Sequence, residues 1–534
     1  MSGEAPTATT SPPPPGPGGL IYPKPTVGLW IGFACMALGN FMAILDIQIV
    51  ASSLREIQAG VSASADELVW IQTSYLVAEV IAIPLSGFMG RALSIRNLFT
   101  AAALGFTLAS FGCAFAQNIG TLVFFRIIQG FMGGFMMPTT FAAGFLLFAE
   151  KDRATVNVMM GMIMTSAPAM GPALGGFITS ALGWHWLFLV NLVPGIVCAV
   201  GCFMLIPLKT PDWPLLRRID IIGLIALAVF LGSLEIVLEE GPRQGWLASS
   251  EIGFFLATML TGGGVFFWRA FTLEEPIVKL DAFTDRNFAV CALLAFTVGI
   301  GLYGSVYLQP LFLGQVRGYN SLQIGQVMFV TGVFMLISAP FARQLIMRVD
   351  PRLAIFAGAS LVGGSCLLQA HLTAQSSFWD FFWPQAMRGS GLILCFATLS
   401  TIALGTMPPH KIQSASGLFN LTRNLGGAIG LAVLSTMNDY FTVFHRTELG
   451  SAMNVGDPLL ADRLAASAAN LAAHGVANPE TAALAQQVQM LNREAAVMTF
   501  NNLFVLIAGF LALSILVIPL LSRAKPNQGS GGIH

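Results

Sequence analysis

Charged residues are scarce in this chain of 534 residues. Asp, Glu, Lys and Arg together make up 10% of it, against about 25% in ordinary soluble domains. Hydrophobic residues make up 55%, and the mean hydropathy is +0.74. So few charges cannot coat the surface of a soluble protein of this size. The composition therefore excludes a soluble enzyme, a nucleic-acid-binding protein and a disordered protein, and indicates a membrane protein that crosses the bilayer many times.

The sequence also lacks the common motifs of catalytic and metal sites. It contains no Walker motif, no HExxH and no GxSxG, and its six histidines are scattered. The seven cysteines lie in apolar stretches and form no CxxC, so neither a disulfide framework nor a zinc site is expected. We therefore expect no enzyme activity, no catalytic residues, no metal ion and no bound cofactor.

Apolar runs of about 20 residues, the length that spans a bilayer as a helix, recur about fourteen times. The expected spans are 27–50, 67–89, 97–117, 120–147, 155–180, 186–208, 219–239, 251–272, 287–313, 321–343, 353–373, 380–407, 412–442 and 497–522. The sequence before the first span has no basic region and no clear cleavage site, so this span is expected to remain as an anchor.

The distribution of basic residues sets the expected orientation, because cytoplasmic connections are enriched in Lys and Arg. With the N-terminus inside, 17 of the 26 basic residues fall in inner segments and 6 in outer ones. The other three, Arg126, Arg388 and Arg423, lie within spans. Both termini are therefore expected in the cytoplasm.

The chain divides into segments of different character. A Pro- and Gly-rich tail at 1–26 and a short tail at 523–534 are expected to be disordered in the cytoplasm. Six-helix bundles are expected at 27–208 and 273–522, with a linker and an inserted helix pair at 209–272. The long Ala-rich connection at 443–496 falls outside the membrane; it is either a passive linker or a docking surface for an extracytoplasmic partner.

The two bundles show weak internal similarity. The fourth span contains Arg126-Ile-Ile-Gln129-Gly130, and the twelfth contains Gln385-Ala-Met-Arg388-Gly389, with the same spacing and with Arg and Gln exchanged. The pattern favours two related halves.

Acidic residues deep in a span are costly and usually face a bundle interior or a water-filled cavity. Asp46 and Arg126 both lie about 6–10 Å from the outer ends of their spans, so they are predicted to meet. A carboxylate that moves between a cation and a desolvated environment can bind and release a proton, as a proton-coupled carrier requires. The alternative is a static ion pair. Glu79, in the middle of the second span, is either a coupling residue or a packing acid, and Glu235 is interpreted as interfacial.

Other polar residues within spans are candidates for contacts with a ligand. Asn191 is one of them, and for the uncharged candidates a hydrogen bond to a neighbouring helix is the favoured alternative. Arg388 could instead balance charge in the second half. The candidates for the substrate cavity are Gln129, Gln309, Arg388, Gln385 and Asn420. In the fifth span, two prolines and three glycines within nine residues predict a bending or sliding contact between the halves, the alternative being a packing helix; these are Pro168, Gly171, Pro172, Gly175 and Gly176.

Several segments in order resemble the major facilitator superfamily, and specifically its fourteen-span drug:proton antiporters of the EmrB/QacA type, most closely the EmrB branch. The segments are LDIQIV at 45–50, Arg126 to Pro138, Pro168 to Gly176, GWHWLFLVNLVPG at 183–195, RRIDIIG at 217–223, EPIV at 275–278, RNF at 286–288 and PPHKIQSASG at 408–417. The resemblance runs from about residue 27 to 525. It implies an all-α fold of two six-helix bundles with an inserted helix pair.

The chain departs from this family at the inner loop after the second span. Arg91 stands where the family has an acid, and Ser94 where it has a second glycine, so the usual charge latch between inner loops is in doubt. Arg91 is a candidate for the conformational switch, and Glu150 or Asp152 is expected to be its partner.

The resemblance implies export of lipophilic toxic compounds across the bacterial inner membrane in exchange for protons. The proton gradient would replace any cofactor, and Asp46, Arg126 and Glu79 would couple it to transport. It also implies a membrane-fusion adaptor of the EmrA type and an outer-membrane channel of the TolC type as partners. The alternatives are a dedicated exporter of one endogenous compound, such as a fatty acid or siderophore, a passive channel, and a membrane scaffold or sensor that transports nothing.

Overall fold

The computed structural model describes residues 26–208, 211–453 and 458–522, and in these ranges the chain is helical without strands. The tails predicted at 1–26 and 523–534 fall outside the described residues except for Thr26. Its hydroxyl caps the first helix by accepting from the N–H of Leu29.

The helices fall into two halves and an inserted pair. The N-terminal half contains α1 (Val27–Ser52), α2 (Leu54–Val61), α3 (Ala65–Leu68), α4 (Trp70–Leu93), α5 (Ile95–Ala114), α6 (Ile119–Leu147), α7 (Glu150–Leu182), α8 (Trp186–Leu189) and α9 (Leu192–Leu205). The short α10 (Trp213–Leu216) leads to the inserted pair, α11 (Ile221–Gln244), η1 (Trp246–Ala248) and α12 (Ser250–Thr272). The C-terminal half contains η2 (Leu280–Thr284), α13 (Arg286–Gln315), α14 (Ser321–Arg348), α15 (Pro351–Gln369), α16 (Phe378–Gly405), η3 (Pro409–Lys411), α17 (Ile412–Ala452), α18 (Pro458–Ala473), α19 (Pro479–Val517) and η4 (Ile518–Leu520).

Twelve helices in the described part of the chain are long and apolar enough to cross a membrane. They coincide with twelve of the predicted spans. The other two predicted spans, 155–180 and 412–442, fall in α7 and α17, which lie inside the bundle: α7 packs against α1 and α14, and α17 packs against α4 and α13. The number of crossings, fourteen, stays a prediction.

The two halves repeat one pattern of packing. In the first, α4 packs on α6, α1 on α7, and α5 on α6 and α9; in the second, α14 packs on α16, α13 on α17, and α15 on α16 and α19. The closest contacts repeat as well. A Cβ atom at Gly130 of α6 would collide with the carbonyl oxygen of Tyr75 in α4, and one at Gly389 of α16 with that of Thr331 in α14. The two glycines are the last residues of the matching motifs of the sequence, so the internal similarity corresponds to the same helix crossing in each half.

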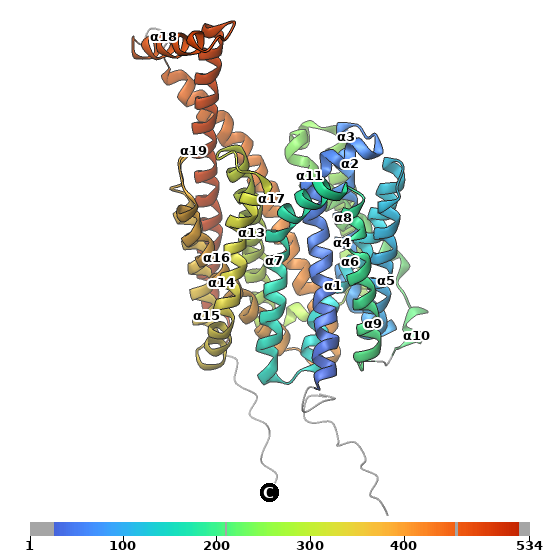
Figure 1. Ribbon diagram of the computed structural model, residues 1–534. Coiled ribbons are helices and arrows are strands. Elements are labelled where there is room, and N and C mark those ends of the chain that lie inside the picture. The colour runs from blue at the N-terminus through green and yellow to red at the C-terminus, as the bar shows by residue number, and fades with distance from the viewer. Residues whose placement is uncertain (1–25, 209–210, 454–457, 523–534) are drawn as a thin grey trace, which may run out of the picture.

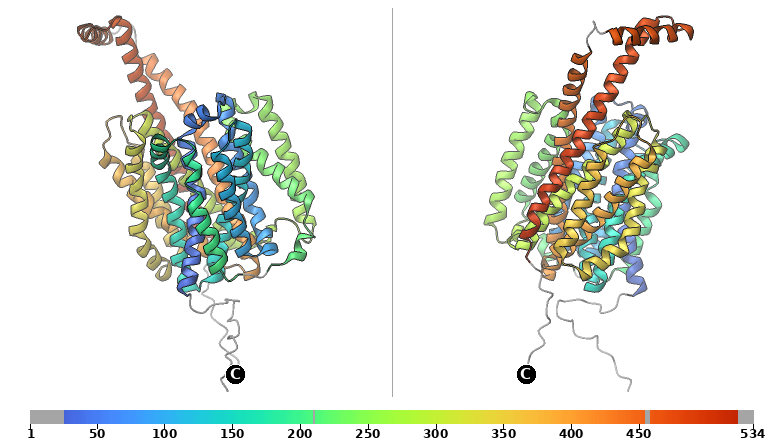
Figure 2. Two further views of the ribbon diagram at one scale, coloured as in Figure 1. Left: turned by 45° about the vertical axis from the view of Figure 1, so that its right-hand side comes forward. Right: turned by 90° about the vertical axis from the view of Figure 1, so that its left-hand side faces the viewer.

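The halves meet along two seams. At one seam α7 packs on α14, and at the other α4 packs on α17. The helix α11 of the inserted pair contacts both α4 and α17, while α12 lies outside it and packs mainly on α11. Figure 2 shows this green pair at the edge of the bundle, beside the second seam.

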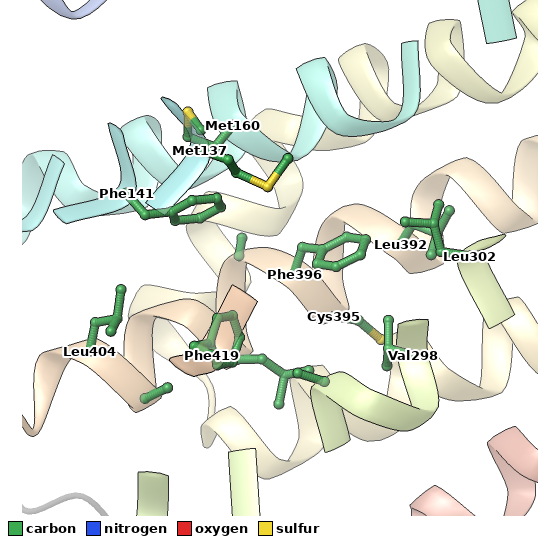
Figure 3. Packing of buried hydrophobic residues seen from close by; sticks show 14 of the residues in the cluster. Met137, Phe141, Met160, Val298, Leu302, Leu392, Cys395, Phe396, Leu404 and Phe419 are labelled. Carbon is green, nitrogen blue, oxygen red and sulfur yellow. The ribbon is translucent and has the colours of Figure 1, made fainter. Parts of the chain in front are cut away.

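The hydrophobic core runs across the boundary between the halves. Figure 3 shows Met137 and Phe141 of α6 and Met160 of α7 facing Phe396 of α16 and Phe419 of α17. All five are buried, at 9% exposure or less. The halves therefore share apolar contacts in this conformation.

The ends of the bundle differ. Figure 1 shows the start of α1 and the end of α19 at one end, here called the terminal end, and α18 at the opposite end. The predicted outer connection at 443–496 is mostly helical: α17 and α19 extend beyond the other helices, and α18 crosses them.

Candidate functional site

Asp46 and Arg126, which the sequence predicts to meet, form an ion pair inside the N-terminal half. The Arg126 Nη1 atom donates to Asp46 Oδ2 at 2.6 Å, and both side chains are completely buried. Asp46 lies on α1 and Arg126 on α6. Two opposite charges at this depth are stabilised only if further hydrogen bonds replace the water they lose.

Neutral side chains supply these hydrogen bonds. The amide nitrogens of Asn191 and Gln129 donate to Asp46 Oδ1 at 2.6 and 3.0 Å. Gln129 also donates to the Ser110 hydroxyl at 2.8 Å and accepts from Arg126 at 2.7 Å. The sequence predicts Gln129 in the substrate cavity, but the structure places it in this cluster, with 0% exposure.

The Arg126 guanidinium is fixed by α4 as well. Its Nε atom donates to the carbonyl oxygen of Ile71 at 3.0 Å, and its central carbon lies 4.2 Å from the ring centre of Tyr75. The cluster thus joins α1, α4, α5 and α6 with Asn191, which precedes α9. A change in the charge of Asp46 would act on all of these elements.

Glu79 lies on α4, and its cationic neighbour comes from the other half. The positive charges that act on its carboxylate are those of Arg423 in α17 and, more weakly, Arg126. Arg423 is completely buried and donates to the side chain of Asn424 at 3.1 Å, while Tyr303 of α13 donates to the same oxygen at 3.1 Å. The sequence predicts that Arg423 lies within the thirteenth span, but no sequence pattern pairs it with Glu79.

Glu235 lies deeper than its interfacial interpretation predicts. The helix α11 ends at Gln244, five residues beyond the predicted span, so Glu235 is 14 residues from the start of α11. Glu79 is equally 14 residues from the end of α4, which places both about 21 Å from the terminal ends of their helices. Their carboxylates interact electrostatically, and a Cβ atom at Gly232 of α11 would lie 3.3 Å from Val77 of α4.

The other predicted cavity residues are buried in the C-terminal half. Arg388 donates to the carbonyl oxygen of Ser305 at 3.3 Å and to Thr331 at 3.0 Å, and Thr331 donates to Gln385 at 2.6 Å. Asn420 donates to Ser416 in its own helix, and both amide atoms of Gln309 lack a hydrogen-bond partner among the described residues. None of the four predicted cavity residues, Arg388, Gln385, Asn420 and Gln309, is more than 1% exposed, so contact with a substrate would need another conformation.

The glycine-rich stretch of α7 faces α1 rather than the other half. A Cβ atom at Gly171 would collide with the side chain of Gln48, and one at Gly175 with that of Ser52. Gly171 and Gly175 thus contact α1 in this conformation, and the predicted contact of this stretch with the other half stays a prediction. Pro168 is buried and Gly176 half-buried, while the side chain of Pro172 falls outside what the structure describes. The switching role of all five stays a prediction.

Arg91 also has a different partner from the one predicted. Its ion pair is with Glu275, in the linker after α12, at 3.9 Å. The side chain of Glu150 is not described, and no ion pair joins Arg91 to Asp152 in the described part of the chain. The same part of the chain contains no group of three His, Cys, Asp or Glu side chains that could hold a metal ion.

Comparisons with known proteins agree with the fold. The family model described as Major Facilitator Superfamily matches residues 29–431. Two solved structures share the fold at 13% identity: the human organic anion transporter MFSD10, with a TM-score of 0.58 over 91% of this chain and 100% of that one, and the proton:xylose symporter XylE, with 0.57 over 91% and 95%.

Relatives match over nearly the whole length. The colistin resistance protein EmrB of Acinetobacter baumannii is 42% identical over 94% of this chain and 98% of its own. The fatty acid resistance protein FarB of Neisseria gonorrhoeae is 30% identical over 96% and 99%, and the multidrug export protein EmrB of Escherichia coli is 29% identical over 95% and 98%. With the family model covering most of the chain and a relative this similar along its length, the chain belongs to the major facilitator superfamily.

Proposed function

We propose that this protein is a proton-coupled efflux transporter that exports lipophilic toxic compounds from the cytoplasm or the inner leaflet by alternating access. The relatives named for resistance to colistin and fatty acids and for multidrug export support export as the activity. We further propose that it lies in a bacterial inner membrane with both termini in the cytoplasm, as the basic residues indicate.

The observation that carries proton coupling is the buried Asp46–Arg126 pair with its amide donors. An acid at this depth is costly unless it is paired, and intramembrane acids of this kind mark proton routes. Protonation of Asp46 would remove the attraction to Arg126 and release its hold on α1 and α6. Glu79, facing Arg423 of the other half, is the second candidate for a coupling residue.

The membrane potential supplies enough energy for this exchange. Each charge that crosses gains about 2.3 kcal/mol per 100 mV, and about 1.4 kcal/mol corresponds to a tenfold concentration ratio. One proton per cycle therefore supports a substantial gradient of exported compound.

The test is transport in proteoliposomes with an imposed pH gradient and a panel of fluorescent lipophilic compounds. We expect uphill movement by the wild type and its loss in Asp46→Asn, with normal expression. Asp439→Asn is the matched control because Asp439 is an exposed acid near the outer end of the predicted span 412–442, away from the Asp46 cluster. Movement only down the substrate gradient would indicate a passive channel, and transport of none of the panel would favour a dedicated exporter or a scaffold. If Asp46→Asn keeps uphill transport, Glu79 becomes the first candidate.

We also propose that the protein works with a membrane-fusion adaptor of the EmrA type and a TolC-type channel. The extension formed by α17, α18 and α19 lies at the end opposite the termini, which is the periplasmic end in this orientation (Figure 1). The helix α18 packs on α19, but none of its residues is buried, so much of its surface is exposed and can contact a partner.

A further inference from the structure

The linker between α12 and α13 crosses the terminal end of the molecule. It covers residues 273–285 and includes η2. Its apolar side chains anchor it, since Ile277, Val278 and Ala282 are 3%, 4% and 2% exposed. The linker is therefore docked on the helices rather than hanging between them.

Two acids of this linker pair with basic residues of different halves. Glu275 lies 3.9 Å from Arg91, in the last turn of α4, and its own linker neighbour Lys279 lies 2.7 Å from the same oxygen. Asp281 lies 2.6 Å from Lys411, which directly precedes α17. The linker thus connects α4 of one half to the start of α17 of the other through two ion pairs in series.

The seam beneath the linker is closed in this conformation. Gln413 donates to the carbonyl oxygen of Ser86 at 3.3 Å, and Ser416 donates to that of Pro138 at 2.8 Å. On the other side of the molecule, Asn157 of α7 donates to Thr401 of α16 at 2.8 Å. These bonds all join the two halves near the terminal end.

We propose that residues 273–285 form an ionic clasp, in which Glu275 and Asp281 are positioning residues that hold the terminal ends of the two halves together in one state of the transport cycle. The inference rests on the proposed function, because a clasp matters only if the halves separate. At Arg91, which stands where the family has an acid, the clasp takes its acid from the linker.

The strength of the pairs suits this role. Arg91, Glu275, Lys411 and Asp281 are 27%, 45%, 36% and 42% exposed at their side chains, and exposed ion pairs contribute little individually. Each pair therefore shifts the equilibrium between closed and open by a few-fold, and the clasp can still open in every cycle. The hydrogen bond from Lys279 lowers the pKa of Glu275, so this acid stays charged at neutral pH.

The experiment measures how fast a maleimide labels the thiol introduced by Ser414→Cys in the purified full-length protein. Ser414 lies in the closed seam, where a Cβ atom at Gly87 would be 2.8 Å from its Cα. We expect labelling to rise several-fold when Glu275→Gln or Asp281→Asn is added. Because the pairs act in series, both changes together should raise it no further than either alone. The parent chain, which keeps Ser414, gives the background from the native cysteines.

Two controls separate the clasp from a general loss of packing. Asp220→Asn breaks the 2.8 Å pair with Arg269, which lies within the inserted helix pair, and should leave labelling unchanged. Lys411→Asp alone should raise labelling, and Lys411→Asp with Asp281→Lys should restore it. Unchanged labelling in the linker variants, additive single effects, or no restoration by the exchange would each overturn the clasp.

A second measurement leaves the linker unchanged, so it tests the clasp even if the linker variants fail to fold. Raising the salt from about 0.05 to 1 M shortens the Debye length to about 3 Å and screens exposed pairs. Salt should therefore speed labelling of the Ser414→Cys variant with its linker intact, and a flat salt response would contradict the clasp. Labelling needs no proton gradient, so a protein that fails to transport but passes these tests would refute the proposed function and leave the clasp standing.

Discussion

The charge cluster at Asp46 combines a high cost of burial with several local hydrogen-bond partners, although Arg126 Nη2 has none among the described residues. Two side chains without exposure to solvent share one short ion pair, and three neutral side chains surround them. A buried ion pair contributes little net stability compared with apolar residues of the same size, while the loss of one partner is strongly destabilising. Stability alone therefore does not explain the pair, whereas the proposed protonation of Asp46 would.

This balance predicts the behaviour of a double-mutant cycle. Arg126→Gln leaves the Asp46 carboxylate buried without its cation and should destabilise the protein by about 3–5 kcal/mol. Asp46→Asn with Arg126→Gln should recover much of this loss, because no lone charge remains. Thermal unfolding in detergent of the four proteins measures both effects. If Arg126→Gln and the double variant lose the same stability, the guanidinium stabilises the protein only through its hydrogen bond to Ile71 and its contact with the Tyr75 ring.

Residue depth explains which parts of the site could be predicted from the sequence. Asp46 and Arg126 lie at similar depths, about 6–10 Å from the outer ends of their spans, and this sufficed to predict their contact. Asn191 could not be assigned to Asp46, because it carries no charge and lies at a helix start. Arg423 could not be assigned to Glu79, because the contact joins two halves whose relative position no local pattern encodes. The sequence places Glu235 too close to the surface, because the charged residues at 239 and 240 continue the helix instead of ending it.

At the scale of elements, α17 and α19 are too long to be simple crossings. They contain 41 and 39 residues, or about 60 Å at 1.5 Å per residue, twice the thickness of the hydrocarbon core. They are tied together where they leave the bundle, since Asn502 of α19 lies 2.9 Å from the imidazole Nε2 of His445 in α17. Arg493 fixes α19 further by donating to the carbonyl oxygens of Val316 and Ala374 at 2.9 and 2.8 Å. The extension is therefore an ordered projection with α18 across its end (Figure 2).

Removing α18 should separate transport from export through the envelope. Replacement of 458–473 by a short Gly-Ser linker deletes a helix with no buried residues, so the bundle should keep its thermal stability within about 0.5 kcal/mol. We expect normal uphill transport in proteoliposomes and a loss of resistance in cells that contain the adaptor and channel. Full resistance in cells would exclude α18 as the docking element, and lost transport in proteoliposomes would show that the helix acts within the carrier itself.

One ion pair joins the two inserted helices at the terminal end, between Asp220, which precedes α11, and Arg269 in the last turn of α12. Burial raises the pKa of Asp220, but the bonds from Arg269 and from the N–H of Gly223 outweigh it, so the pKa lies below the usual value. A carboxyl with a lowered folded pKa stabilises the fold above its unfolded pKa of about 3.9 and loses this contribution as pH falls through the folded value.

Stability of the wild type should therefore be unaffected by this group between about pH 8 and 5, and should fall below about pH 4. Asp220→Asn should lose about 2 kcal/mol at neutral pH, because it removes a charge-assisted hydrogen bond. Thermal unfolding from about pH 8 to 3 compares the two proteins, and their difference should shrink in acid. A difference that stays constant over the whole range would show that the asparagine is destabilising for reasons other than charge.

The whole molecule is built from two equivalent halves whose contact differs along its length. The pairings α1–α7 and α13–α17, and α4–α6 and α14–α16, make each half a unit held by close glycine contacts. Between the halves, the hydrogen bonds of Gln413, Ser416 and Asn157 gather near the terminal end. In the orientation that the basic residues predict, the protein is closed towards the cytoplasm.

A wedge in this closed seam should shift the molecule towards its other state. A Cβ atom at Gly87 of α4 would lie 2.8 Å from the backbone of Ser414, so Gly87→Val cannot be accommodated unless the halves separate there. Gly405→Val is the matched control, since no atom lies within 4 Å of the Cβ position at Gly405, also near the terminal end. The readout is maleimide labelling of Thr401→Cys, because the Thr401 side chain faces Asn157 across the other seam. We expect faster labelling and slower transport in Gly87→Val but not in Gly405→Val. Faster labelling at Ser414→Cys without any change at Thr401→Cys would mean that the wedge acts only locally, and that the two seams do not open together.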